Sequence, residues 1–131
     1  MRLRHRADMG WTLIELMIVI TLVTVLSTLA LVGYRSAITR SREAVLKEDL
    51  FRMRDAIDQY YADQQGYPAS LAALVGDGYL RSLPLDPFTG VADWEPILAE
   101  PDPSAPIAQG VFDVKTNHEG TALDGTPYSD W

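Results

Sequence analysis

The sequence predicts an α+β fold in which a long N-terminal α-helix packs on a small C-terminal antiparallel β-sheet. Three observations predict it. The helix breakers are segregated, because all eight prolines follow Gly66 and Gly33 is the only glycine between Trp11 and Gln65. Before Gly66 apolar residues recur at helical spacing. After it, turn signals separate two short strand candidates.

The first part of the predicted helix, residues 11–34, has the composition of a membrane span. Glu15 is its only charged residue, and a helix of about 20 apolar residues is long enough to cross a bilayer. The apolar run is too long for the core of a cleaved secretory signal peptide. Because three arginines precede it and positive residues stay in the cytoplasm, we expect a single pass with a cytoplasmic N-terminus.

The second part of the helix, residues 35–64, is amphipathic. Its apolar residues follow one another in steps of four and three, with charged residues between them. This stripe needs a surface to lie on, and we expect that surface to be built by residues 65–131, so that residues 35–131 form one head. The stripe consists of Leu46, Leu50, Met53, Ile57 and Tyr60.

The residues after the helix read as short elements joined by turns. Ser70 is placed to cap a helix over residues 71–75, and strands are expected around residues 94–98 and 110–116. A proline-rich connection separates the strands, and a loop from Asn117 to Trp131 ends the sequence. We expect the aromatic residues near the end of the long helix to pack in the core, namely Phe51, Tyr60, Tyr61 and Tyr67.

Composition excludes several kinds of site. Without cysteine there is no disulfide, thiolate nucleophile or zinc-thiolate centre. Residues 65–131 carry two basic and ten acidic residues, which argues against a nucleic acid partner for the head and is compatible with a bound cation. No catalytic constellation is visible, so we do not expect an enzyme. The helix charges are expected to be solvated or to pair between subunits, as for Arg40, Arg42, Glu43, Glu48 and Asp49.

Residues 10–16 carry the sequence Gly-Trp-Thr-Leu-Ile-Glu-Leu after a basic leader. This motif resembles the class III signal of type IV pilins and type II secretion pseudopilins. The resemblance implies a leader of residues 1–10 and cleavage between Gly10 and Trp11 by a membrane prepilin peptidase, which also methylates the new N-terminus at Trp11. It further implies that Glu15 pairs with the N-terminal amine of a neighbouring subunit and sets the register of assembly.

The head extends the resemblance. The runs Gly-Tyr-Pro at 66–68, Leu-Pro-Leu-Asp-Pro-Phe-Thr-Gly at 83–90 and Gly-Val-Phe-Asp-Val at 110–114, with Trp131, occur in the order seen in major pseudopilins. The resemblance implies a pilin-like structural subunit of a pseudopilus that drives protein export. Its implied partners are further copies of itself, minor pseudopilins, an inner-membrane assembly platform and membrane lipid.

In major pseudopilins the terminal loop is held by Ca²⁺, so the resemblance also implies a calcium site here. Oxygen ligands of the type that Ca²⁺ prefers occur along this loop, and the predicted ligands are Asn117, Glu119, Asp124 and Asp130. The alternative is that Asp124 and Gly125 form an ordinary turn and the acidic residues are solvated.

Two other functions stay open at this point. The chain could be the pilin of a surface filament used for adhesion, motility or DNA uptake, since the leader motif is shared. It could also be a membrane-anchored periplasmic binding domain or enzyme, which would keep an uncleaved N-terminus.

Overall fold

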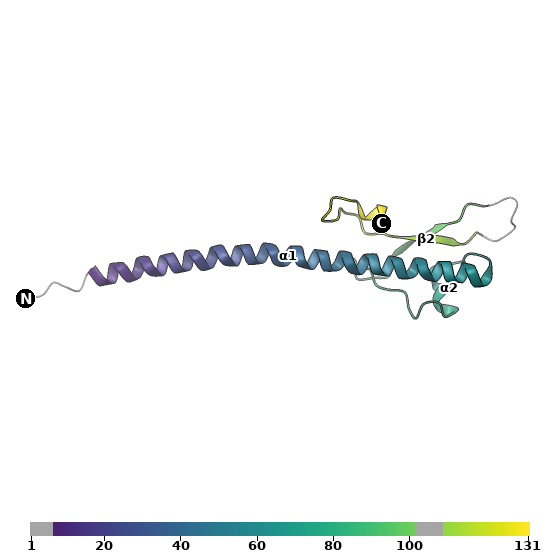
Figure 1. The fold of residues 1–131 in the computed structure, drawn as a ribbon, viewed down its shortest axis with the longest axis horizontal. Coiled ribbons are helices and arrows are strands. Elements are labelled where there is room, and N and C mark those ends of the chain that lie inside the picture. Colours follow the sequence, from purple (N-terminus) through teal and green to yellow (C-terminus); the bar gives the residue numbers. More distant parts are fainter. Residues whose placement is uncertain (1–6, 102–108) are drawn as a thin grey trace, which may run out of the picture. The chain divides into compact units, whose positions relative to one another are not determined.

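The computed structural model describes residues 7–101 and 109–131 (Figure 1). In chain order the elements are helix α1 (Ala7–Gln64), helix α2 (Leu71–Gly76), strands β1 (Trp94–Leu98) and β2 (Val111–Thr116), and a 3₁₀ turn at Tyr128–Asp130. The predicted α+β class is confirmed. The chain divides into two compact units, one up to Ile38 and one from Thr39 on, and each is described separately.

Helix α1 differs from the prediction at its start and agrees with it at its end. It begins at Ala7, four residues before Trp11, because a single glycine inside a helix costs only about 1 kcal/mol relative to alanine and no proline lies nearby. After Gln64 the helix stops, since Gln65 takes a left-handed conformation with φ of 56°. Its N–H donates to the Tyr61 carbonyl at 2.9 Å, which is a common way for a helix to terminate.

The predicted apolar stripe of α1 forms the centre of the core. Leu46, Leu50, Met53 and Ile57 are 0–2% exposed, and burying each such side chain contributes about 1.5–3 kcal/mol. Tyr60 and Tyr67 pack against this core, as expected.

The expectation for Phe51 is wrong, because its side chain is 67% exposed. It follows Leu50 directly, and each residue of an α-helix turns by about 100°. Phe51 therefore points away from the face on which Leu50 is buried. Tyr61 is also exposed, although its ring centroid lies 4.6 Å from that of Tyr67.

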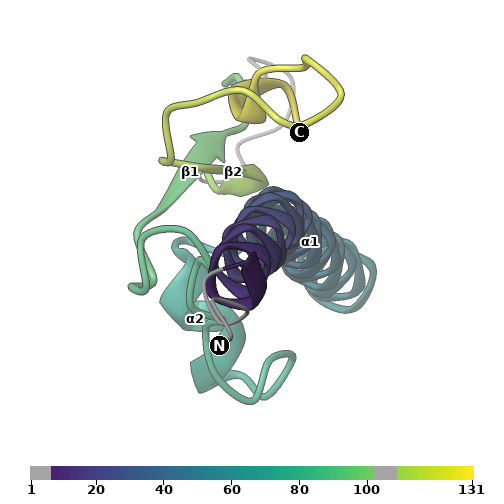
Figure 2. The same ribbon diagram turned by 90° about the vertical axis from the view of Figure 1, so that its left-hand side faces the viewer.

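Strands β1 and β2 form a two-stranded antiparallel sheet with Trp94 opposite Thr116. Ser70 caps α2, as predicted, by accepting a hydrogen bond from the Ala73 N–H. Figure 2 shows the sheet and α2 on different sides of the head part of α1. This part of α1 is therefore covered from two directions, by Leu71 and Leu74 of α2 and by Trp94, Val111 and Val114 of the sheet.

The turn that leads into β1 is held by a buried carboxylate. Asp86 is 1% exposed, and its Oδ1 accepts hydrogen bonds from the N–H groups of Phe88 at 2.7 Å and Thr89 at 3.3 Å. Its Oδ2 accepts a hydrogen bond of 2.5 Å from the Thr116 hydroxyl. Because Thr116 ends β2, Asp86 ties this turn to the sheet.

Candidate functional site

The N-terminal unit presents an apolar helical surface that is exposed among the described residues. Every residue from Trp11 to Tyr34 is exposed, and Trp11 is 73% exposed. Among the described residues, α1 alone is long and apolar enough to cross a membrane, with a mean hydropathy of 2.5 in its most apolar window. The segment fits a membrane anchor, because lipid or other apolar helices would cover this surface.

The polar side chains of this unit do not interrupt its apolar character. The hydroxyls of Thr21, Thr24 and Thr28 donate to backbone carbonyls one turn earlier, at 2.7–2.8 Å. Their donors are therefore satisfied inside the helix, as an apolar environment requires. Glu15 remains as the single ionisable side chain between Trp11 and Tyr34.

The predicted processing residues lie near the start of α1. Residues 1–6 of the predicted leader lie outside the described residues, while Gly10 and Trp11 belong to the helix. Trp11 and Glu15 are both exposed and one helical turn apart, so they share a face. Cleavage after Gly10, methylation of Trp11 and pairing of Glu15 stay predictions.

The predicted calcium ligands are not brought together. Asn117 and Glu119 line a pocket of about 420 Å³, whereas Asp124 and Asp130 line another of about 410 Å³ together with Lys47 and Arg54. Within residues 7–101 and 109–131 no three His, Cys, Asp or Glu side chains are grouped as they would be around a metal ion. As placed, these four residues do not fit a single Ca²⁺ ion, which needs six to eight oxygen ligands.

Asp124 forms a turn within the terminal loop. Its Oδ1 accepts hydrogen bonds from the Thr126 hydroxyl at 2.6 Å and the Thr126 N–H at 3.0 Å. These two hydrogen bonds hold the pKa of the Asp124 carboxyl below its ordinary value, and the bond from the hydroxyl has the larger effect. The geometry is that of the ordinary turn that was the alternative to a calcium ligand.

Charged residues of α1 contact the terminal loop directly. Glu43 Oε1 accepts hydrogen bonds from the Leu123 N–H at 2.8 Å and the Tyr128 hydroxyl at 3.0 Å. Burial, reinforced by the Glu43 carboxylate, raises the pKa of Tyr128 to about 12. The Arg54 guanidinium donates to Asp113 and to the backbone oxygens of Val114 and Trp131 at 2.7–3.0 Å.

Sequence reasoning missed Glu43, Arg54 and Asp86 as contact residues. It assigned Glu43 to a solvated or inter-subunit face and included Asp86 only in the motif at residues 83–90. A signal for the helix residues was present, because Glu43 and Arg54 border the apolar stripe on the same side. No comparable signal marks Asp86, since its partner Thr116 lies 30 residues away.

Asp49 is a buried acid of α1, and its environment gives a pH-dependent prediction. It is 9% exposed, and burial raises the pKa of its carboxyl, with the charges of Glu48 and Asp86 adding to the effect and Arg52 opposing it. A carboxyl with a raised pKa in the folded state destabilises that state when it is ionised. The penalty is fully present above the folded-state pKa and disappears as the pH falls below the unfolded-state value.

Asp49→Asn is therefore expected to raise the melting temperature at pH 7 by up to about 4 °C. The gain should shrink as the pH is lowered through 4. Near-UV circular dichroism of the full chain in detergent measures both, and Asp58→Asn, at an exposed position of the same helix, is the matched control. A gain that is equal at pH 7 and pH 3.5 would contradict the assignment.

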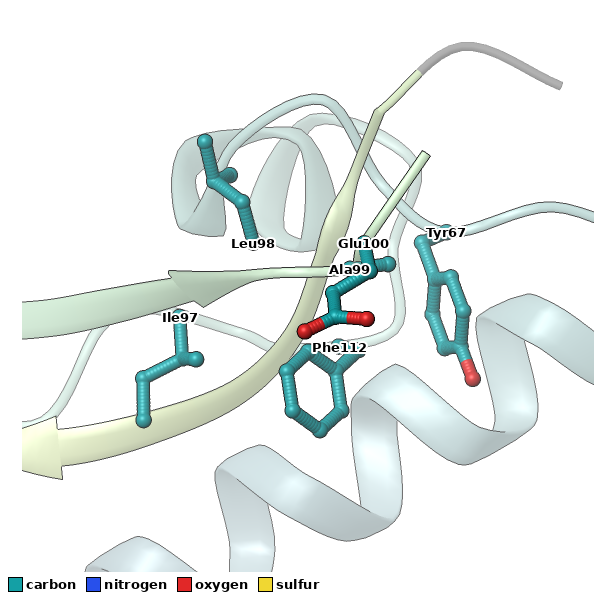
Figure 3. Close-up of a pocket in the computed structure, with 6 residues that line it drawn as sticks. All are labelled: Tyr67, Ile97, Leu98, Ala99, Glu100 and Phe112. Atoms are coloured by element: carbon teal, nitrogen blue, oxygen red, sulfur yellow. The ribbon is translucent and has the colours of Figure 1, made fainter. Parts of the chain in front are cut away.

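A groove of about 410 Å³ lies between Tyr67 and the paired ends of β1 and β2 (Figure 3). Tyr67 forms one wall, and Leu98 and Phe112 are exposed beside it. Gly110 lies so close to Tyr67 that an added Cβ would come within 2.6 Å of the Tyr67 backbone oxygen. The next residue, Val111, donates its N–H to the Pro68 carbonyl at 2.8 Å. The two backbone segments are therefore held close together at neighbouring positions.

Gly110→Ala is therefore expected to destabilise the head by about 2–3 kcal/mol, because the clash is with backbone and has no easy relief. The matching fall in melting temperature is about 8–24 °C. Gly76→Ala is the control, since nothing lies within 4 Å of the added Cβ there. Equal melting temperatures for the two variants would show that the close approach is not required.

Comparison with known proteins gives significant matches along most of the chain. It is 30% identical over 122 residues to the fimbrial protein EcpC of Eikenella corrodens, covering 89% of this chain and 77% of that protein. It is 31% identical over 102 residues to the type II secretion system core protein G of Pseudomonas aeruginosa, covering 66% and 72%. The core protein G of Klebsiella michiganensis is 26% identical over 98% of this chain and 92% of its own length.

No protein-family model matches the chain, and no solved structure matches it significantly. The relatives and the fold nevertheless agree, because a long helix with an apolar first part and a small α+β head is the arrangement that the resemblance implied. None of the names of these relatives denotes an enzyme. The chain belongs to the type IV pilin-like family, which includes the major pseudopilins of type II secretion.

Proposed function

We propose that the chain is the structural subunit of a type II secretion pseudopilus that polymerises through its N-terminal helix and supports protein export across the outer membrane. The observation that carries this proposal is the apolar surface of residues 11–34, which is exposed along its whole length and holds one carboxylate. In a monomer lipid covers such a surface, and in a filament the same segments of neighbouring subunits replace lipid by packing together.

The proposal includes processing and topology. The basic residues of the leader keep the N-terminus in the cytoplasm, and the acidic head is exported to the periplasm. A prepilin peptidase cleaves after Gly10, and the new N-terminus at Trp11 is methylated. The subunit then passes from the inner membrane to an assembly platform and joins minor pseudopilins and further copies of itself.

Charge explains why cleavage is coupled to assembly in this proposal. Cleavage creates an α-amine at Trp11 that is largely protonated near neutral pH, because its reference pKa is about 8. Glu15, one turn further along the helix, supplies a negative charge on the same exposed face. Pairing the amine of one subunit with Glu15 of its neighbour neutralises both groups in an apolar surrounding.

Mass analysis of the N-terminus of the native protein tests the proposal most directly. The expected result is a chain that starts at Trp11 with a mass increase of one methyl group. An intact Met1 in protein taken from its own membrane would contradict the proposal and favour a membrane-anchored periplasmic domain.

A second candidate is the pilin of a surface filament, which the similarity to a fimbrial protein favours. The two candidates share cleavage and polymerisation and differ in the native filament. Short filaments confined to the periplasm, together with loss of secreted proteins in a deletion strain, would support the pseudopilus. Long filaments on the cell surface with unchanged secretion would support the pilin.

A further inference from the structure

We propose that charged side chains of α1 hold the terminal loop, residues 117–131, in the role that a bound Ca²⁺ was predicted to fill, so that the folded head needs no divalent cation. This inference concerns the stability of the head and does not depend on the proposed function.

Glu43 provides the central contact. A single carboxylate oxygen, Oε1, accepts both the Leu123 N–H and the Tyr128 hydroxyl. Tyr128 is 3% exposed, and its ring lies in a row of ring contacts between Phe88, His118 and Trp131, with centroids 5.0–5.2 Å apart. Glu43 therefore fixes the loop at one backbone position and at its most buried side chain.

Lys47 and Arg54 extend this contact along the helix. Lys47 Nζ lies 4.0 Å from the centroid of the Trp131 ring, a cation–π contact. Arg54 donates to the Trp131 oxygen at 2.7 Å and to Val114 at 3.0 Å. Positions 43, 47 and 54 fall within a narrow stripe of a helix with 3.6 residues per turn, so one face of α1 carries all three contacts.

Several oxygen atoms of the terminal loop are engaged in hydrogen bonds within it. The carbonyls of Gly120, Ala122 and Thr126 accept hydrogen bonds of 2.8–3.1 Å from the N–H groups of Tyr128, Gly125 and Ala122. Asp124 Oδ1 accepts two more hydrogen bonds from Thr126. The loop is thus closed by its own backbone and by the turn at Asp124, without a cation between these groups.

Electrostatics at the same place disfavours a divalent cation. Asp124 and Asp130 share their pocket with Lys47 and with Arg54, which is itself paired with Asp113. A divalent cation placed there would be repelled by both basic side chains. Asn117 and Glu119, which lack such neighbours in their pocket, lie in the other pocket and cannot complete the same site.

The test uses the full chain in detergent micelles and follows melting of the head by near-UV circular dichroism. We expect excess EGTA or 5 mM CaCl₂ to shift the wild-type melting temperature by less than about 1 °C, and calorimetric titration with CaCl₂ to give no heat of binding. Glu43→Ala should lower the melting temperature by at least about 5 °C, and CaCl₂ should not restore it.

Two further variants make the test specific. Glu43→Gln keeps an acceptor oxygen but loses the charge, and neutral hydrogen bonds are weaker than charge-assisted ones. It should melt between the wild type and Glu43→Ala, and it reports on the contact even if the alanine variant does not fold. Glu48→Ala removes an exposed glutamate that pairs with Arg52 one turn away, and it should shift the melting temperature by less than about 2 °C, because exposed pairs contribute little. Amide hydrogen exchange at Leu123 should become at least about tenfold faster in Glu43→Ala.

The opposite results would overturn the inference. A wild-type melting temperature that falls by 5 °C or more in EGTA, or a saturable heat of Ca²⁺ binding, would show that a cation holds the loop. Glu43→Ala and Glu48→Ala variants with equal melting temperatures would show that Glu43 does not hold it.

Discussion

Asp86→Ala is expected to lower the melting temperature of the head by at least about 12 °C. The substitution removes the acceptor for the N–H groups of Phe88 and Thr89 and for the Thr116 hydroxyl. Leaving a buried donor without a partner costs about 1–3 kcal/mol per group. A total loss of about 3 kcal/mol or more follows, and each 1 kcal/mol corresponds to about 4–8 °C in a domain of this size.

The same hydrogen bond can be removed from its other end. Thr116→Val keeps the shape of the side chain and deletes the hydroxyl, which leaves Asp86 Oδ2 buried without this donor and also removes the acceptor of the His118 N–H. We expect a loss of similar size. Asp58→Ala, at an exposed position of α1, is the control and should change the melting temperature by less than about 2 °C. A melting temperature of Asp86→Ala close to that of this control would contradict the assignment.

Sequence periodicity predicted most of the fold because local rules decide it. The apolar stripe of α1 recurs at steps of three and four, and Leu46, Leu50, Met53 and Ile57 are buried accordingly. The cap at Ser70 and the end of α1 at Gln64 also depend only on neighbouring residues. In these elements the side chain and the structure that it determines lie within one or two turns of each other.

The contacts that fix the head could not be predicted in the same way, because they join residues far apart in the chain. Glu43 meets Tyr128 across 85 positions, and Arg54 meets Trp131 across 77. Their charges are compatible with a solvated helix face, with pairing between subunits, or with a contact inside the head. Only the path of the terminal loop over α1 decides among these three, and periodicity carries no information about that path.

The predicted calcium ligands show the limits of sequence proximity in a loop. Asn117, Glu119, Asp124 and Asp130 are close in sequence and chemically suited to Ca²⁺, yet the turns of the loop divide them between two pockets. Closeness in sequence predicts closeness in space for a regular helix or strand. A loop with positive φ at Gly120 and Gly125 reverses direction within a few residues, so it can separate neighbouring side chains.

Glu15→Ala is expected to leave insertion and cleavage intact while reducing filament formation at least about tenfold, the change that a loss of about 1.4 kcal/mol per subunit contact would cause. The Glu15 carboxylate destabilises the monomer in the membrane and stabilises the filament. A carboxylate at the bilayer centre costs about 3 kcal/mol on insertion scales, so removing it favours the monomer in the membrane. If assembly nevertheless fails, the carboxylate must have a partner in the filament.

Measurement requires the processed subunit in its own membrane. Cross-linking or sedimentation of sheared filaments measures assembly, and N-terminal mass analysis confirms that the variant has been cleaved after Gly10. Glu48→Ala, on the head part of α1, is the control for loss of a helix carboxylate outside the apolar segment. Glu15→Asp separates charge from reach, because it keeps the negative charge on a side chain one methylene shorter. Assembly of cleaved Glu15→Ala at the wild-type level would mean that the carboxylate does not set the register, and that packing of the exposed apolar surface alone drives polymerisation.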